Sequence, residues 1–253
     1  MGSVGGGRPQ KLVPPSRSSP FWLDGRLALL DRSSLTSNTV LVGGRTLHLA
    51  APAGAQIGVD DTLHGKILYS AGWGSVRDGT YRSGLFVVAH GRRATIRSEA
   101  DPSGGSGPGS ASLSPRGYRV AFLDGLNGVD LWVASADGKN AVRLTGSTRV
   151  TKEGPLLWSQ DGKWVAFTAH RAGVREVYVV RTDGSSPARR LTTTRLPAPP
   201  VDQSGTVPVA WLGPDALAVV SANSLGVLRT GGGPVQRICT VPNTSFSSAT
   251  PLG

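Results

Sequence analysis

The feature that most constrains the fold of this chain is an internal repeat of about 45 residues. The segment 114–122 (SPRGYRVAF) aligns with 159–167 (SQDGKWVAF), and three shorter matches follow in the same order. These are Leu131-Trp132-Val133 with Val177-Tyr178-Val179, Asp137-Gly138 with Asp183-Gly184, and Leu144-Thr145 with Leu191-Thr192. A repeat of this length is one supersecondary unit, which must stack on its neighbours to bury its apolar face.

Each unit reads as four strands, with a Gly turn after the first, a polar loop after the second and an Asp-Gly turn after the third. Asp-Gly between two apolar runs predicts a hairpin with a type I′ turn, which needs positive φ at both central residues. Four antiparallel strands in about 45 residues make one blade of a β-propeller. The composition agrees, because 35 Gly and 18 Pro beside 38% hydrophobic residues suit many short strands around a core.

Weaker copies flank the clear pair, and they share a Trp just before the first turn, at Trp22, Trp158 and Trp211. A large aromatic at a recurrent position is expected to wedge neighbouring blades together. The sequence predicts five complete blades, at about 20–55, 57–98, 111–145, 157–192 and 209–240.

The two ends of the chain resemble parts of a sixth blade. Residues 5–12 (GGGRPQKL) are similar to residues 231–238 (GGGPVQRI), the last turn and outer strand of the fifth unit. We therefore expect an all-β, six-bladed propeller, one domain over 1–253, with its ring closed by 1–13 and 241–253. Closure removes open sheet edges. The alternative is a segment cut from a larger protein, which would also begin in mid-blade.

The repeat pattern resembles the PD40 (WD40-like) repeat of TolB-like propellers, most clearly over 111–192. The chain departs from that pattern at Arg116, where the family has the Asp that is kept at Asp161. The resemblance implies a propeller, but such propellers serve as envelope assembly factors, as sensor or lipoprotein domains, and as gating domains of prolyl-oligopeptidase-like enzymes. It suggests the periplasm or cell envelope, although residues 1–10 lack the apolar segment of a secretory signal.

The sequence contains no nucleophile elbow, P-loop, HExxH or paired-cysteine motif, and no two histidines have the spacing of a metal pair. We therefore expect no catalytic, cofactor-binding or metal-binding residues. Asp24, Asp137, Asp161 and Asp183 precede Gly and are expected to cap turns. Cys239 lies in an apolar run and is expected to be buried.

These observations favour a non-enzymatic, monomeric scaffold that binds a protein or peptide. The alternative is a gating propeller of a prolyl-oligopeptidase-like hydrolase whose catalytic domain is absent from this chain. No apolar stretch reaches the roughly 18 residues of a membrane span.

The formal net charge of +11 raises anionic polymers as a third class of partner. The recurrent cations fall on or beside the fourth strands, where charge blocks edge-to-edge pairing, so nucleic acid is not expected as a partner. These cations are Lys11, Arg92, Arg93, Arg143, Arg189, Arg190 and Arg237.

Four residues are candidates for partner binding. Trp73 and Arg77 lie in the Gly-flanked loop 71–79, which is longer than its equivalents in the other units. His170 and Arg171 lie where the second strand of the fourth unit meets its loop. Conspicuous loop residues held by a rigid scaffold often contact a ligand, so we expect these four to project from a propeller face.

Overall fold

The computed structural model describes residues 18–31, 38–100, 108–125, 129–146, 150–171, 174–193, 205–221 and 224–240. Within these ranges it contains β-strands and no helix, and so none that could span a membrane. The strands form five separate four-stranded antiparallel sheets, each built from consecutive strands. The predicted all-β fold with four-stranded units is confirmed, whereas the segments 1–13 and 241–253 lie outside the described residues.

The strand bounds follow the repeat. The first sheet contains β1 (Ser18–Leu23), β2 (Arg26–Asp31), β3 (Thr39–Val42) and β4 (Arg45–His48). The second contains β5 (Gln56–Leu63), β6 (Lys66–Trp73), β7 (Arg82–Ala89) and β8 (Arg92–Ala100). The third contains β9 (Gly109–Leu113), β10 (Arg119–Asp124), β11 (Asp130–Ser135) and β12 (Val142–Arg143). The fourth contains β13 (Thr151–Trp158), β14 (Trp164–Arg171), β15 (Val174–Arg181) and β16 (Arg189–Arg190). The fifth contains β17 (Thr206–Trp211), β18 (Ala216–Ser221), β19 (Ser224–Arg229) and β20 (Gln236–Thr240).

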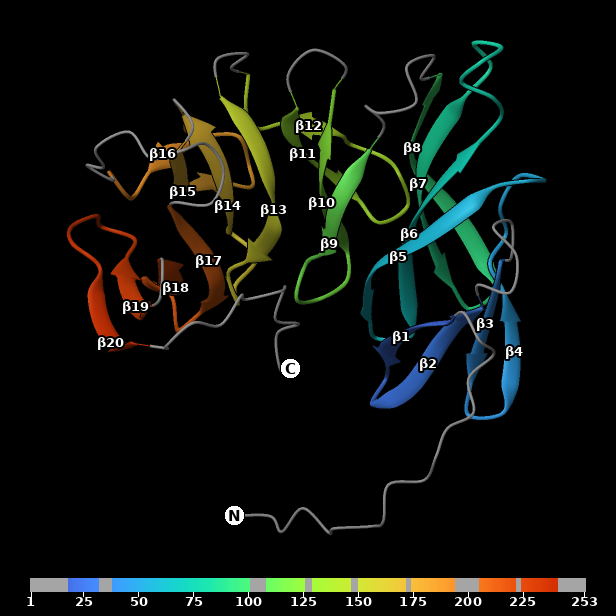
Figure 1. Cartoon of the computed structure of the whole chain (residues 1–253), viewed down its shortest axis with the longest axis horizontal. Helices are drawn as coiled ribbons and strands as arrows, with labels where there is room; N and C mark the ends of the chain where they lie inside the picture. Colours follow the sequence, from blue (N-terminus) through green and yellow to red (C-terminus); the bar gives the residue numbers. More distant parts are fainter. Residues whose placement is uncertain are drawn as a thin grey trace, which may run out of the picture.

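The sheets follow one another around an arc, with the first and the fifth at its two ends (Figure 1). The first strands of consecutive sheets contact each other, so β1, β5, β9, β13 and β17 line the inside of the arc. The turns after the first and third strands lie at the lower end in Figure 1, which we call the turn end. The second strands end, and the third strands begin, at the opposite end, which we call the hairpin end.

The turns are of two kinds, and the prediction of type I′ turns at Asp137-Gly138 and Asp183-Gly184 is wrong. Only the Gly of each pair has positive φ, whereas a type I′ turn needs it at both central residues. Gly138 N donates to Ser135 O at 2.8 Å, so the turn at Asp137-Gly138 is longer by one residue than a two-residue loop. Both central residues have positive φ at Asp24-Gly25 and at His64-Gly65, as a type I′ turn requires.

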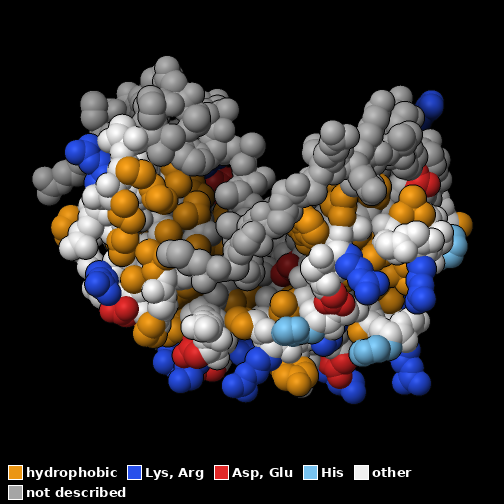
Figure 2. Space-filling view, turned by 90° about the horizontal axis from the view of Figure 1, so that it is seen from below, with side chains coloured by type: hydrophobic (Ala, Val, Ile, Leu, Met, Phe, Trp, Pro, Cys, Tyr) orange, Lys and Arg blue, Asp and Glu red, His pale blue; other side chains and the backbone are white. Residues whose placement is uncertain are grey.

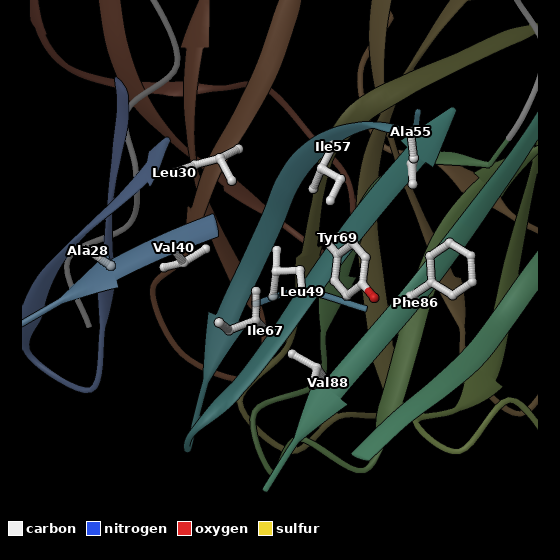
Figure 3. Packing of buried hydrophobic residues seen from close by; sticks show 11 residues of the cluster. Ala28, Leu30, Val40, Leu49, Ala55, Ile57, Ile67, Tyr69, Phe86 and Val88 are labelled. Atoms are coloured by element: carbon white, nitrogen blue, oxygen red, sulfur yellow. The ribbon is translucent and has the colours of Figure 1, made fainter. Parts of the chain in front are cut away.

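The core lies between neighbouring sheets, because strand residues alternate between the two faces of each sheet. Ala28, Leu30 and Val40 of the first sheet pack against the second, where Ile67 and Tyr69 are fully buried (Figure 3). The Tyr69 hydroxyl donates to Ala50 O at 2.7 Å, so its polar atom is satisfied inside this core. Each such large side chain contributes about 1.5–3 kcal/mol by burial.

The recurrent tryptophans join each sheet to the one before it. Trp158 Nε1 donates to Ser112 O at 3.1 Å, and Trp211 Nε1 donates to Leu157 O at 2.9 Å. Both acceptors lie on the first strand of the preceding sheet. Trp22 occupies the same position in the first sheet, and it is 61% exposed because no described sheet precedes it. The expected wedging role is therefore met at Trp158 and Trp211.

The Leu-Thr pair that closes each clear repeat has a structural reason. Thr145 Oγ1 accepts a hydrogen bond from Leu131 N at 2.9 Å and donates to Asp130 Oδ1 at 3.0 Å. Thr192 does the same in the next sheet, with Val177 N as donor and Glu176 as acceptor. The threonine thus caps the start of the third strand and holds a carboxylate there.

The expectation that Cys239 is buried is wrong. It lies on β20, the outermost strand of the fifth sheet, where every residue is exposed. The apolar run around it reflects an outer strand of mixed composition rather than a core strand.

Candidate functional site

The four residues predicted to bind a partner all lie at the hairpin end, but in two different sheets. Trp73 ends β6 and Arg77 lies in the turn that follows, whereas His170 and Arg171 end β14. The third sheet lies between these two pairs (Figure 1). The structure therefore does not bring the two pairs into one site.

Trp73 is half-buried and packs against the core between the first and second sheets, with its ring centroid 6.3 Å from that of Phe86. Its loop is closed by Thr80 N donating to Ser75 O at 2.9 Å, and Arg77 is exposed on it. A role of Trp73 and Arg77 in binding stays a prediction.

His170 belongs to a small polar cluster that crosses three strands. Its Nε2 lies 2.9 Å from Glu153 Oε1, and Arg175 Nε donates to the same oxygen at 2.6 Å. Glu153 is therefore already satisfied by partners within its own sheet. The side chain of Arg171 lies outside the described part of the structure.

Buried carboxylates at the boundaries between sheets were missed by the sequence interpretation, which placed most acidic residues in turns. Asp61 Oδ2 accepts from Leu113 N at 2.8 Å and from Ser112 Oγ at 3.2 Å, which joins the second sheet to the third. Burial raises the pKa of Asp61, and that of its neighbour Asp60 to about 6. The signal in the sequence was an Asp pair interrupting the apolar pattern of a strand.

A second carboxylate pair lies further along the same boundary. Asp124 Oδ2 lies 2.7 Å from Arg97 Nε, and Glu99 Oε2 lies 3.4 Å from Nη2 of the same arginine. Burial, and then hydrogen bonding with Asp124, raise the pKa of Glu99. These groups join one sheet to the next through a common arginine, which is a structural role.

A cleft lies at the turn end, between the first turns of the third and fourth sheets. Its volume is about 150 Å³. Figure 2 views the molecule from this end and shows Lys and Arg side chains gathered along the rim of the face. We call this cleft the inner-turn cleft. It is lined by Ser114, Pro115, Arg116, Tyr118, Arg119, Gln160, Asp161 and Gly162.

The cleft lies where direct contact between successive first turns stops. Asp24 Oδ1 accepts from Gly65 N at 2.9 Å, and His64 Nε2 lies 3.2 Å from Pro115 O, which joins the first three turns in series. Among the described residues no hydrogen bond joins the third turn to the fourth, and the two turns line the walls of the cleft instead.

Arg116 stands where the neighbouring turn has Asp161. Asp161 Oδ1 accepts from Ser159 Oγ at 2.7 Å and from Lys163 N at 3.0 Å, and these hydrogen bonds hold its pKa below the usual range. An arginine cannot accept either bond. The turn nevertheless keeps its shape, because Ser114 Oγ accepts a hydrogen bond from Arg119 N at 3.1 Å. The Arg116 side chain is exposed, and it forms no hydrogen bond or ion pair with the described residues.

Arg119 lies on the wall of the cleft and is held by neutral groups. Its Nη1 donates to Thr182 Oγ1 at 3.0 Å and its Nη2 donates to Thr182 O, and its guanidinium carbon lies 5.7 Å from the centroid of the Trp158 ring. Burial lowers the pKa of Arg119, although an arginine remains charged at any physiological pH. Within the described ranges no carboxylate lies within ion-pair distance of it, and the more distant charge of Asp183 acts against the effect of burial on its pKa.

An exposed aromatic completes the rim. Tyr118 is 70% exposed, and Lys66 Nζ from the second sheet lies 5.7 Å from the centroid of its ring. Gly117 adopts a φ of +69°, and a β-carbon there would lie 3.2 Å from Lys66 Nζ. Glycine at this position therefore both permits the turn and leaves room for the ammonium group.

The size and chemistry of the cleft define what it can hold. Its volume is well below the roughly 300–1,000 Å³ of pockets that enclose a small molecule, and suits one side chain of a partner. In the described part of the chain, no three His, Cys, Asp or Glu side chains converge on a metal-sized site. The contacts that the cleft offers to a partner are the guanidinium groups of Arg116 and Arg119 and the ring of Tyr118.

Known proteins share sequence and structural similarity with this chain. No family model matches the chain. Over 64 residues the chain is 48% identical to tricorn protease homolog 2 of Streptomyces coelicolor, which is 25% of this chain and 5% of that protein.

Solved structures extend the likeness to most of the chain. TolB of Agrobacterium tumefaciens is similar over 87% of this chain and 79% of its own, with a TM-score of 0.53 and 20% identity. Oligopeptidase B of Trypanosoma brucei is similar over 91% of this chain but only 35% of its own, with a TM-score of 0.63 and 11% identity. An oligogalacturonate lyase of Vibrio parahaemolyticus is similar over 87% of this chain and 63% of its own, with a TM-score of 0.57 and 12% identity.

The sheets and these neighbours define the structure as a β-propeller. Its fold is that of the TolB-like, PD40-type propellers, as the repeat predicted.

Proposed function

We propose that this chain is a non-enzymatic, monomeric propeller that binds a protein or peptide partner at its turn end. The observation that carries the proposal is the inner-turn cleft, where Arg116 and Arg119 have no carboxylate partner within the described residues and Tyr118 is exposed. Guanidinium and aromatic groups are the side chains on which protein interfaces most depend. Binding sites on propellers are built from such turns, which vary while the blades keep the scaffold.

Two measurements on the purified chain test this function. Selection from a phage-displayed library of random peptides should yield sequences that bind the wild-type chain and are displaced by the free peptide. A screen with hydrolase-directed activity probes and peptide substrates should give no turnover. Failure to select any peptide, or robust turnover that one substitution in a polar residue abolishes, would refute the proposal.

A second candidate function is that of an accessory propeller, which gates access to a hydrolase domain absent from this chain. The similarity to oligopeptidase B supports it, because this chain spans 35% of that enzyme. The full reading frame of the gene decides between the two: an adjacent α/β-hydrolase domain would favour gating.

The proposal includes a single six-bladed domain over 1–253, in which 1–13 and 241–253 form the sixth blade. The outward face of the fifth sheet supports it, since Val220 pairs with Leu225 there and Val227 lies on the same side, none of them covered by a described sheet. At the other end of the arc, Trp22 is exposed although its counterparts reach back to a preceding sheet. A sixth blade would cover both apolar faces and give the Trp22 indole an acceptor.

A chain that begins at residue 14 is expected to melt several degrees below the full-length chain and to aggregate. Loss of an outer strand leaves backbone amides and carbonyls of its neighbour unpaired. Removal of a segment without buried contacts would instead leave the melting temperature unchanged.

The matched readout for this comparison is tryptophan fluorescence. In the full-length chain, replacing Trp22 by phenylalanine should remove a blue-shifted component of the emission, because a sixth blade would bury the indole. An unchanged melting temperature after truncation, together with a Trp22 emission typical of water, would contradict ring closure.

A further inference from the structure

The charges at the turn end are not spread evenly. On the described turns of the third, fourth and fifth sheets, each Lys or Arg outside the inner-turn cleft pairs with an aspartate of the same sheet. The pairs are Lys139–Asp137 at 3.5 Å, Lys163–Asp161 at 3.6 Å, Arg181–Asp183 at 2.8 Å and Arg229–Asp215 at 3.1 Å. On these described turns, the cations without an ion-pair partner are therefore Arg116 and Arg119 of the cleft.

The two arginines are suited to one kind of group. A guanidinium binds a carboxylate through two parallel hydrogen bonds, and such charge-assisted bonds strengthen where water is partly excluded. Arg119 is already half-buried, and hydrogen bonds from its Nη1 and Nη2 to Thr182 fix it, so it adds positive charge with little side-chain entropy left to lose. The exposed guanidinium of Arg116 is the one that remains available for two parallel bonds. Asp161, the one acid on the wall, is compensated by Lys163 and by hydrogen bonds within its own turn.

We propose that the inner-turn cleft receives the carboxylate of an Asp or Glu side chain from an extended acidic segment of a protein partner. The carboxylate binds between Arg116 and Arg119, and the neighbouring part of the segment passes over Tyr118 towards Lys66. This inference rests on the proposed function and names the chemistry of its partner.

A peptide fits the surface better than a nucleic acid or an anionic polysaccharide does. The cleft holds about one side chain, whereas a polyanion gains its affinity by neutralising many charges along a continuous basic strip. On the turn end of the fourth and fifth sheets, Lys163, Arg181 and Arg229 are each paired with an aspartate. The exposed Arg189, Arg190 and Arg237 lie apart from these turns, on the outer strands. A segment with one or two carboxylates and an otherwise neutral backbone matches this pattern.

The test is Arg116→Asp, with Arg116→Lys beside it. Asp is the residue that the equivalent turn of the fourth sheet carries at Asp161, where it caps the turn, so the variant is expected to fold at least as well as the wild type. Arg189→Asp makes the same change of charge on the exposed outer strand β16 and serves as the matched control.

Binding is measured by fluorescence anisotropy with a fluorescein-labelled nonapeptide of alternating glutamate and alanine. The same peptide with glutamine for glutamate, and an oligothymidine of equal charge, are the comparison probes. We expect Arg116→Asp to weaken binding of the acidic peptide about tenfold or more, Arg116→Lys to weaken it by less, and Arg189→Asp to change it by less than about twofold. The glutamine peptide should bind at least about tenfold more weakly than the acidic one.

Three outcomes would overturn the inference. These are no binding of the acidic peptide up to about 1 mM, equal effects of Arg116→Asp and Arg189→Asp, or tighter binding of the oligothymidine with the same loss in Arg116→Asp. The third would identify a polyanion site instead. If the display library yields peptides that are not acidic, the proposed function stands and only this inference fails; if it yields none, the function itself fails.

Discussion

Replacing Asp130 by asparagine is expected to lower the free energy of unfolding by about 3 kcal/mol. Asp130 lies on the third sheet and Lys152 on the fourth, both are 5% exposed, and Lys152 Nζ lies 2.8 Å from Asp130 Oδ1. Replacing Asp130 removes the negative charge of a buried ion pair that joins two sheets, and breaking such a pair destabilises proteins by about 3–5 kcal/mol. Arg143 also contacts Asp130 from the exposed side, and water can still reach it, so we take the lower value.

Chemical denaturation at pH 7 measures this effect, with Asp137→Asn as the matched control. Asp137 pairs with Lys139 in an exposed turn, and screening by water makes such pairs weak. A loss of stability in Asp137→Asn as large as that in Asp130→Asn would contradict the assignment of Asp130 as the link between the sheets.

Asp130 also sets an acid limit to stability. Burial opposes its ionisation, but hydrogen bonds from Lys152, Arg143 and Thr145 together hold its pKa below the ordinary value. A carboxyl whose pKa is lower in the folded state stabilises the protein above its unfolded pKa, and that stability is lost as the pH falls through the folded pKa.

Replacing Asp60 by asparagine is expected to raise the melting temperature at pH 7.5 by about 5–10 °C. Burial raises the pKa of Asp60 from 3.8 to about 6, against hydrogen bonds from Ser70 and Ala111 that lower it. Its Oδ2 is buried and has no hydrogen-bond partner within the described structure. The shift of about two pKa units corresponds to about 3 kcal/mol that the wild type loses on ionisation, and 1 kcal/mol moves the melting temperature by about 2–4 °C in a domain of this size.

The sign of the pH dependence follows from the raised pKa. The stabilising contribution of protonated Asp60 is fully present below pH 4 and is lost as the pH rises through about 6. Asp60→Asn should remove this loss, so its melting temperature should change less than that of the wild type between pH 4.5 and 7.5.

Asp61→Asn is the control for Asp60→Asn. Asp61 accepts hydrogen bonds from Leu113 N, Ser112 Oγ and Thr62 N, and an amide nitrogen in its place would face donors. This variant should be no more stable than the wild type. If Asp60→Asn gains nothing at pH 7.5, or keeps the pH slope of the wild type, Asp60 is not the ionisable group responsible.

The blades could be predicted because their signals are local and repeated. Trp158 and Trp211, the Leu-Thr pairs and the Gly turns each have a reason within one unit or between two adjacent ones, and each recurs along the chain. The type of the turn at Asp137-Gly138 could not be predicted from the repeat. It depends on where the pairing of β11 with β12 stops, and this fixes how many residues remain for the turn.

The candidate site could be predicted only in part. Loop length and residue type drew attention to Trp73 and His170, but their side chains are engaged by Phe86 and Glu153. Arg116 was visible as the position that breaks the repeat, yet its meaning depends on Arg119 and on the fourth turn, which lies some 45 residues further along. The link between Asp130 and Lys152 is likewise a contact between sheets that no spacing along one strand reveals.

The hydrogen bonds that the indoles of Trp158 and Trp211 donate to a neighbouring sheet both run toward the N-terminus of the chain. Trp158 and Trp211 each bond to a carbonyl that was synthesised before them, on the sheet that precedes their own. During translation, each newly completed sheet thus meets an acceptor that has already emerged from the ribosome and folded. The third, fourth and fifth sheets can therefore be added in the order of synthesis, each upon the one before it.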